Sequence, residues 1–271
     1  MSKDLVLVTG ASGYIAGYCI GELLEHGYAV RATVRSLAAA DRVAHLRALA
    51  EQSKGTLEFV EAELDSDRGW PEAVAGRTYV LHVASPNPLA APKHEDELIR
   101  PAVDGTLRVL RACADSGTVR RVVLTSSMVA VTLGPDRNSD RVLTEDDWSD
   151  PDLCPAYPKS KTLAERAAWD FVAALPAEQR FELATINPGY VLGPQQRAEL
   201  GLSAEGPSVN WAGPCARPRR PLWTQGEAWS SSAFSAGRSV NLAALCSARR
   251  IQQRSFMAYD HQHRLWTRST S

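Results

Sequence analysis

Hydrophobic positions in the first 190 residues alternate between short apolar runs and longer stretches with helical spacing. Apolar residues three or four positions apart predict helices between the runs, one of them with Pro101 as a kink or a new start. Strands that alternate with helices imply an α/β fold with a doubly wound parallel sheet. The predicted strands are 4–9, 28–35, 57–61, 78–83, 121–126 and 181–186, and the predicted helices are 13–26, 38–52, a short one near Trp70, 95–115 and 157–174.

The first apolar run enters a turn that contains Gly10 and Gly13, and a helical pattern follows at once. Gly10 lets the chain turn sharply out of the strand, and Gly13 removes a side chain where a pyrophosphate must come close. The helix that begins there directs free N–H groups and its positive dipole end toward the phosphates. This strand–turn–helix context predicts a dinucleotide site of the Rossmann-fold type.

The end of the second run indicates which dinucleotide is bound. Arg35 stands there, and the next acidic residue, Asp41, already belongs to the following predicted helix. A guanidinium can bind a 2′-phosphate through two hydrogen bonds, whereas a carboxylate would repel it. With Arg31 or Arg42 as a second cation, the pattern favours NADP over NAD.

A candidate catalytic set follows the fifth run. Ser127 comes directly after that strand, and Tyr157 and Lys161 are four residues apart on one helix face. We expect the ammonium to lower the pKa of the phenol, which then gives its proton to a carbonyl oxygen as hydride reaches the carbon. Ser127 can hydrogen-bond the same oxygen.

These motifs together resemble the extended short-chain dehydrogenases/reductases. Within them the chain is most similar to the group of dihydroflavonol 4-reductase, cinnamoyl-CoA reductase and yeast-type carbonyl (methylglyoxal) reductase. The resemblance covers about residues 3–197. It rests on the segments 9–15 (TGASGYI), 30–35 (VRATVR), 82–86 (HVASP), 125–127 (TSS), 157–165 (YPKSKTLAE) and 187–194 (NPGYVLGP).

The resemblance implies an NADP-dependent oxidoreductase that reduces an aldehyde or ketone to an alcohol, with Ser127, Tyr157 and Lys161 as catalytic residues. Glu63 stands where the family usually has aspartate beside the adenine. The implied cofactor-binding residues are Gly10, Ser12, Gly13, Tyr14, Ile15, Arg35, Arg42, Glu63, Leu64, Val83, Ala84, Ser85, Tyr157, Lys161 and Pro188.

Composition narrows the partners and the setting. The chain has 271 residues and a formal net charge of -1, so neither nucleic acid nor an anionic membrane is expected as a partner. The 5 cysteines form no CxxC pair, which fits a reducing cytoplasm. No signal peptide or membrane span is expected. No metal site is expected either, because His261 and His263 lack further ligands at metal spacing.

Residues 198–271 break with the composition of the rest. They contain nine arginines, no lysine and four acids, and only nine leucine, isoleucine or valine residues. We therefore divide the chain into a cofactor-binding domain with the catalytic residues, 1–197, and an atypical segment, 198–271, that reads as a divergent, out-of-frame or poorly ordered substrate lobe.

Three alternatives to the reductase remain open at this point. A nucleotide-sugar epimerase or dehydratase of the same superfamily would typically retain NAD, and a hydroxysteroid-type dehydrogenase would share the catalytic set. The third is an NADP-binding protein without efficient turnover, because the substrate lobe is not recognisable after residue 197.

Overall fold

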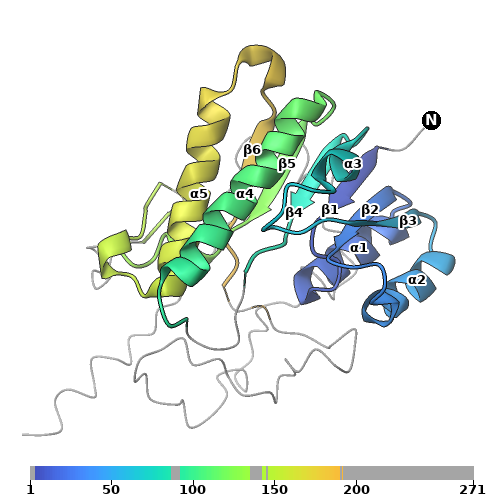
Figure 1. Cartoon of the computed structure of the whole chain (residues 1–271), viewed down its shortest axis with the longest axis horizontal. Coiled ribbons are helices and arrows are strands. Elements are labelled where there is room, and N and C mark those ends of the chain that lie inside the picture. Colours follow the sequence, from blue (N-terminus) through green and yellow to red (C-terminus); the bar gives the residue numbers. More distant parts are fainter. Residues whose placement is uncertain (1–3, 87–91, 135–141, 145, 190, 192–271) are drawn as a thin grey trace, which may run out of the picture.

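The computed structural model describes residues 4–86, 92–134, 142–144, 146–189 and 191 (Figure 1). Within these residues one six-stranded sheet has the order β3-β2-β1-β4-β5-β6, and every neighbouring pair is parallel. This order confirms the predicted doubly wound sheet. The strands are β1 (Leu5–Val8), β2 (Ala29–Val34), β3 (Thr56–Glu61), β4 (Tyr79–His82), β5 (Arg121–Thr125) and β6 (Glu182–Ile186).

The helices fall close to their predicted ranges, with two differences. The predicted helix over 38–52 is a 3₁₀ turn, Ala40–Val43, followed by a shorter α-helix. Pro101 starts no new helix, since it lies inside one continuous helix. The helices are α1 (Tyr14–Glu25), α2 (Ala44–Glu51), α3 (Trp70–Val74), α4 (Asp96–Ser116) and α5 (Ala156–Ala174).

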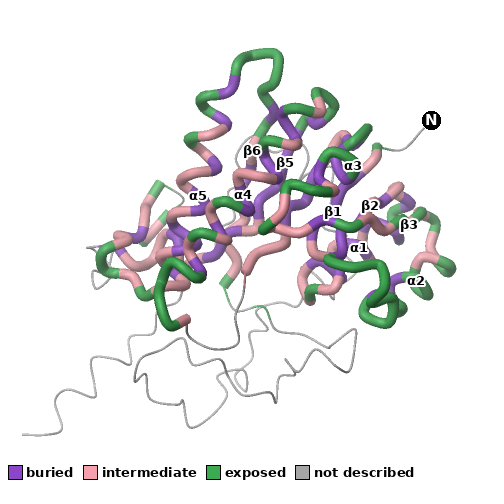
Figure 2. The backbone as a smooth tube through the Cα atoms, viewed as in Figure 1, coloured by how far each residue is buried: buried purple, intermediate pink, exposed green. Residues whose placement is uncertain are grey.

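The sheet separates two hydrophobic cores, because successive side chains of a strand point to opposite faces. In β1, Val6 and Val8 pack with α1 and α2, whereas Leu7 packs with α3, α4 and α5. The central strands are buried, and exposed residues lie on the outer surfaces of the helices (Figure 2). Both cores therefore hold the carboxyl ends of all strands on the same side of the sheet, where the candidate residues lie.

The described part of the chain shows neither of two features that would redirect the search for a site. No three histidine, cysteine or acidic side chains gather there as metal ligands. None of the described helices is both long and apolar enough to cross a membrane. His261, His263 and the whole of 198–271 lie outside the described residues, so the division of the chain at residue 197 stays a prediction.

Candidate functional site

The glycine turn after β1 has the geometry of an anion-binding helix start. Gly10 has a φ of 76°, and a Cβ added there would lie 3.0 Å from the Cβ of Ala84, so glycine is required. Gly13 begins α1 with no side-chain cap, and the Gly17 N–H donates to its carbonyl at 3.0 Å. The N–H groups that precede Gly17 in the first turn, from Tyr14 to Ala16, therefore have no carbonyl partner within the helix. This cradle fits a pyrophosphate.

The remaining residues predicted for this turn surround the same helix start. Ser12, Tyr14 and Ile15 are all partly exposed, and the N–H of Gly10 donates to the hydroxyl of Thr33 at 2.9 Å. The turn is thus fastened to β2 from one side while its helix-start N–H groups remain directed outward.

A buried hydroxyl fastens the turn from the other side. Thr9 Oγ1 accepts hydrogen bonds from the N–H groups of Val83 (3.0 Å) and Ala84 (2.9 Å) and lies 2.9 Å from Nδ1 of His82. Since a hydroxyl has two lone pairs and one proton, Thr9 donates that proton to Nδ1. The residue before Gly10 thereby connects the end of β1 to the segment after β4, which sequence reasoning missed.

His82 acts as part of this packing and is not an acid or base. Its ring is fully buried, and burial, with a smaller effect of the Lys161 charge, lowers its pKa to about 3. The ring therefore stays neutral at physiological pH.

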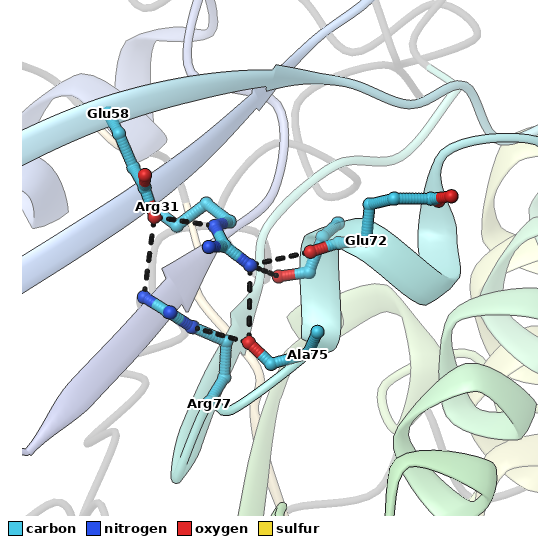
Figure 3. Close-up of polar contacts among 6 residues, drawn as sticks. Arg31, Glu58, Glu72, Ala75 and Arg77 are labelled. Carbon is cyan, nitrogen blue, oxygen red and sulfur yellow. Dashed lines mark hydrogen bonds and ion pairs between the residues drawn. The ribbon is translucent and has the colours of Figure 1, made fainter.

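The arginines near the end of β2 separate into two groups. Arg31 donates to Glu58 at 2.6 Å and to the carbonyls of Glu72 (2.5 Å) and Ala75 (3.2 Å), which lie at the end of α3 (Figure 3). Arg77 also reaches Glu58, at 3.5 Å. Arg31 is therefore committed to closing the C-terminal end of α3, and its prediction as a phosphate ligand is wrong.

Arg35 and Arg42 are both exposed beyond the end of β2, where the cofactor prediction needs them. The structure also brings an acid to this place from the neighbouring strand. Glu61 pairs with Val34 in the sheet, and its carboxylate accepts the N–H of Leu37 at 2.6 Å. Reading β2 alone could not find this acid, because it comes from β3.

The predicted adenine contacts lie between two helices. The carbonyl of Glu63 accepts the indole N–H of Trp70 at 2.8 Å. Leu64 lies so close to α4 that a Cβ added at Gly105 would stand 2.9 Å from its Cβ. The glycine in α4 therefore lets the helix approach the segment 63–64 closely.

The three predicted catalytic side chains come together at the carboxyl ends of β4 and β5. Ser127 and Lys161 are buried and Tyr157 is partly buried, and Ser127 hydrogen-bonds the Tyr157 hydroxyl. Burial raises the pKa of Tyr157 above its ordinary value, and the hydrogen bond from Ser127 opposes this more weakly. The expectation that Lys161 lowers the pKa of Tyr157 is corrected, because desolvation of the phenol dominates.

Lys161 is held away from solvent by the segment after β4. Its Nζ donates to the hydroxyl of Ser85 at 2.8 Å and lies 5.8 Å from the centroid of the Tyr157 ring. Burial lowers the pKa of Lys161 to about 8, and the charge of Glu165 acts in the opposite direction. At pH 7 the amine is therefore still mostly protonated. Ser85, which was predicted only as a cofactor contact, positions this ammonium.

Pro188 contacts the loop that follows Ser127. Its carbonyl accepts the N–H of Met128 at 3.0 Å, and Asn187 donates to the carbonyl of Ser127 at 3.1 Å. Pro188, a predicted cofactor contact, is thus joined to the loop that carries Ser127. Asn187 and Glu165 were quoted within motifs but received no role. The signal that could have found Glu165 is its spacing of four residues from Lys161.

Comparisons with known proteins identify the family of this chain and several relatives. Residues 7–204 match the model of the 3-beta hydroxysteroid dehydrogenase/isomerase family. The chain is 42% identical over 206 residues to a cinnamoyl-CoA reductase of Medicago truncatula, covering 74% of this chain and 62% of the relative. It is 39% identical over 199 residues to a dihydroflavonol 4-reductase of Arabidopsis thaliana, covering 71% and 50%.

A solved structure agrees with these relatives. The crystal structure of Gre2 from Candida albicans in complex with NADPH aligns with a TM-score of 0.61 and 32% identity, covering 71% of this chain and 59% of that one. The chain therefore spans between half and two thirds of the length of the proteins it matches. The confirmed resemblance lies in the part that carries the sheet, the glycine turn and the three catalytic candidates.

Proposed function

The chain belongs to the 3-beta hydroxysteroid dehydrogenase/isomerase family of extended short-chain dehydrogenases/reductases, and we propose that it reduces an aldehyde or ketone to an alcohol with NADPH. The observation that carries the proposal is the meeting of Ser127, Tyr157 and Lys161 at the carboxyl ends of the strands. Ser127 contacts the Tyr157 hydroxyl, and the Nζ of Lys161 lies 5.8 Å from the centroid of the Tyr157 ring. A protonated phenol at this place suits proton donation to a carbonyl oxygen.

In the proposed reaction each residue of the site has a separate role. NADPH, when bound, supplies the hydride. Tyr157 donates its proton to the oxygen of the substrate, and the hydroxyl of Ser127 holds that oxygen by a hydrogen bond. The ammonium of Lys161, fixed by Ser85 at 2.8 Å, stabilises the phenolate that remains after proton transfer.

The glycine turn and the arginines support the choice of NADPH. Gly10 and Gly13 leave room for the pyrophosphate, and the N-terminal end of α1 faces it. Arg35 and Arg42 would hold the 2′-phosphate. A relative of similar fold, Gre2 of Candida albicans, was solved with NADPH, which agrees with this assignment.

Turnover with and without the phenolic hydroxyl tests the proposal. Purified protein is mixed with NADPH and a panel of aldehydes and ketones, and the loss of NADPH absorbance is followed. Tyr157→Phe should lower kcat by about a thousandfold, since a general acid contributes roughly 10²–10⁴, and it should leave NADPH binding in place. The control Tyr28→Phe removes a tyrosine hydroxyl just before β2, at the amino ends of the strands, and should keep wild-type turnover. Wild-type turnover in Tyr157→Phe would remove this residue from the mechanism.

A second candidate is an NADP-binding protein without efficient turnover. The observation that favours it is that the family match ends at residue 204, while the rest of the chain has no counterpart in that match. NADPH binding without loss of NADPH on any carbonyl of the panel would favour this candidate over the reductase.

A further inference from the structure

Glu165 is a buried acid with an unusual number of donors around it. It lies on α5 with 4% of its surface exposed, one helical turn beyond Lys161. The hydroxyl of Ser126 donates to its Oε2 at 2.5 Å, and the amide of Asn187 donates to the same oxygen at 2.9 Å. The indole N–H of Trp169 lies 3.5 Å from its Oε1. All three of these contacts donate to the carboxyl oxygens of Glu165.

These bonds connect three separate parts of the site. Ser126 comes from the end of β5 and Asn187 from the end of β6, whereas Glu165 belongs to the helix that carries Tyr157 and Lys161. Asn187 uses its amide a second time, to hold the carbonyl of Ser127 at 3.1 Å. Glu165 is therefore the point at which the serine loop is fastened to the catalytic helix.

The buried hydroxyl residues on α5 do not make such connections. The hydroxyl of Thr162, which is fully buried, donates to the carbonyl of Pro158 at 2.8 Å, and that of Ser160 donates to the carbonyl of Tyr157 at 2.7 Å. Both bonds stay within the helix. Burying the carboxyl of Glu165 is costly unless it is well paired, so its placement points to a role that a neutral hydroxyl does not fill.

Glu165 also stands one helical turn from Lys161 on α5, and its charge acts on that ammonium. The titratable groups near Lys161 are Tyr157 and Glu165 on α5 and His82 on β4. His82 is neutral, and burial by itself drives Lys161 toward its neutral form. Among these neighbours, Glu165 is the group whose charge favours the ammonium.

We propose that Glu165 is a positioning residue, whose carboxylate sets Ser127 against Tyr157 through Ser126 and Asn187 and keeps Lys161 charged. The inference deepens the proposed reductase function and rests on it for its kinetic part. Glu165 touches neither substrate nor cofactor in this assignment, because its contacts all lie behind the catalytic side chains.

Kinetics of two substitutions separate positioning from simple stability. Glu165→Gln keeps the size of the side chain but loses the charge, and it should lower kcat about tenfold to a hundredfold, as expected for hydrogen bonds to a charged group worth roughly 1.5–3 kcal/mol. The KM for NADPH should change by less than about threefold, because the glycine turn and Arg35 are left unchanged. Glu165→Asp keeps the charge and should retain more of kcat than Glu165→Gln.

The pH profile supplies a measurement that a loss of stability would not move. Removing a negative charge lowers the pKa of neighbouring groups, so the alkaline limb of kcat should shift to lower pH in Glu165→Gln and stay near its wild-type position in Glu165→Asp. Thr162→Val is the matched control. It removes a buried hydrogen bond of the same helix, so it should lower the melting temperature without moving the limb.

A titration of Lys161 decides the same point without turnover. The chain has five lysines, so protein labelled with ¹³C at the lysine side chains gives few signals, and the signal absent in Lys161→Arg is that of Lys161. Its pKa should be about 8 in the wild type and lower in Glu165→Gln. A wild-type protein that reduces no carbonyl would refute the proposed function, while this titration would still judge Glu165.

Two results would overturn the inference. One is a wild-type kcat and an unchanged Lys161 titration in Glu165→Gln. The other is a loss of kcat in Glu165→Gln that only parallels its loss of melting temperature, as in Thr162→Val, with the alkaline limb unmoved. If Glu165→Gln does not fold, Glu165→Asp decides by itself, because withdrawing the carboxylate by one methylene must lower kcat more than Thr162→Val does.

Discussion

A single atom, the hydroxyl oxygen of Thr9, joins the cofactor turn to the segment after β4. Replacing Thr9 by valine keeps the volume but removes the acceptor for the N–H groups of Val83 and Ala84 and the donor to His82. A buried polar group left without a partner costs about 1–3 kcal/mol. Because both N–H groups are only partly buried, we take the lower end of this range, about 1 kcal/mol, for each of the two N–H groups and for Nδ1 of His82.

The sum is a loss of about 3 kcal/mol in the free energy of unfolding, which lowers the ratio of folded to unfolded protein roughly 150-fold. The substitution also loosens the contact between Gly10 and Ala84, where a Cβ added at Gly10 would lie 3.0 Å away. The Kd for NADPH should therefore rise about tenfold, which corresponds to one lost hydrogen bond of about 1.4 kcal/mol.

Urea unfolding and fluorescence titration with NADPH measure the two effects. The control is Thr118→Val, at the amino end of β5, which removes the bond from the exposed Thr118 hydroxyl to the carbonyl of Arg77 at 3.1 Å and a longer one to the hydroxyl of Ser116 at 3.4 Å. It should cost about 1 kcal/mol or less and leave the Kd unchanged. A Thr9→Val protein as stable as Thr118→Val, with wild-type affinity for NADPH, would refute the reasoning.

Two further predictions concern charge. Arg35→Glu should weaken NADPH binding by at least about tenfold and make NADH the preferred cofactor, because a carboxylate repels the 2′-phosphate. The control is Arg111→Glu, which makes the same charge change on the exposed face of α4. Equal affinities of the wild type for NADPH and NADH would count against the assignment. His82 has its pKa lowered from 6.5 to about 3, so the unfolded chain binds its proton first. Its contribution to stability is complete above about pH 6.5 and is lost as the pH falls toward 3, by up to roughly 1.4 kcal/mol per pH unit. Urea unfolding at several pH values should show this loss in the wild type and a smaller one in His82→Gln, whereas equal slopes in both proteins would contradict it.

Most elements and the cofactor turn could be predicted from the sequence because their signals are local. Apolar run length and helical spacing placed each strand and helix within a few residues, and the glycine turn lies within one strand–helix connection. Tyr157 and Lys161 could be paired because four residues make one turn of a helix. The 3₁₀ turn at Ala40–Val43 was missed, since it has the same apolar spacing as the helix that follows.

Interactions between distant segments could not be read in this way. Arg31 has the residue type of a phosphate ligand, but α3 arrives beside it and takes its donors through backbone carbonyls, which no side-chain pattern reveals. The acid that approaches the end of β2 is Glu61 from β3, brought there by strand register. The pKa of Tyr157 depends on how much water the surrounding elements exclude, and therefore moves upward where the neighbouring lysine alone suggested the opposite.

The sequence by itself determined which residues can do chemistry in this protein and which elements carry them, because period, turn and spacing are properties of neighbouring residues. Tertiary structure alone decided the state in which those residues work. Burial raises the pKa of Tyr157 and lowers that of Lys161 to about 8, and Glu165 reaches Ser126 and Asn187 across 39 and 22 positions of the chain. Desolvation and long-range hydrogen bonds exist only once the sheet has brought the ends of its strands together.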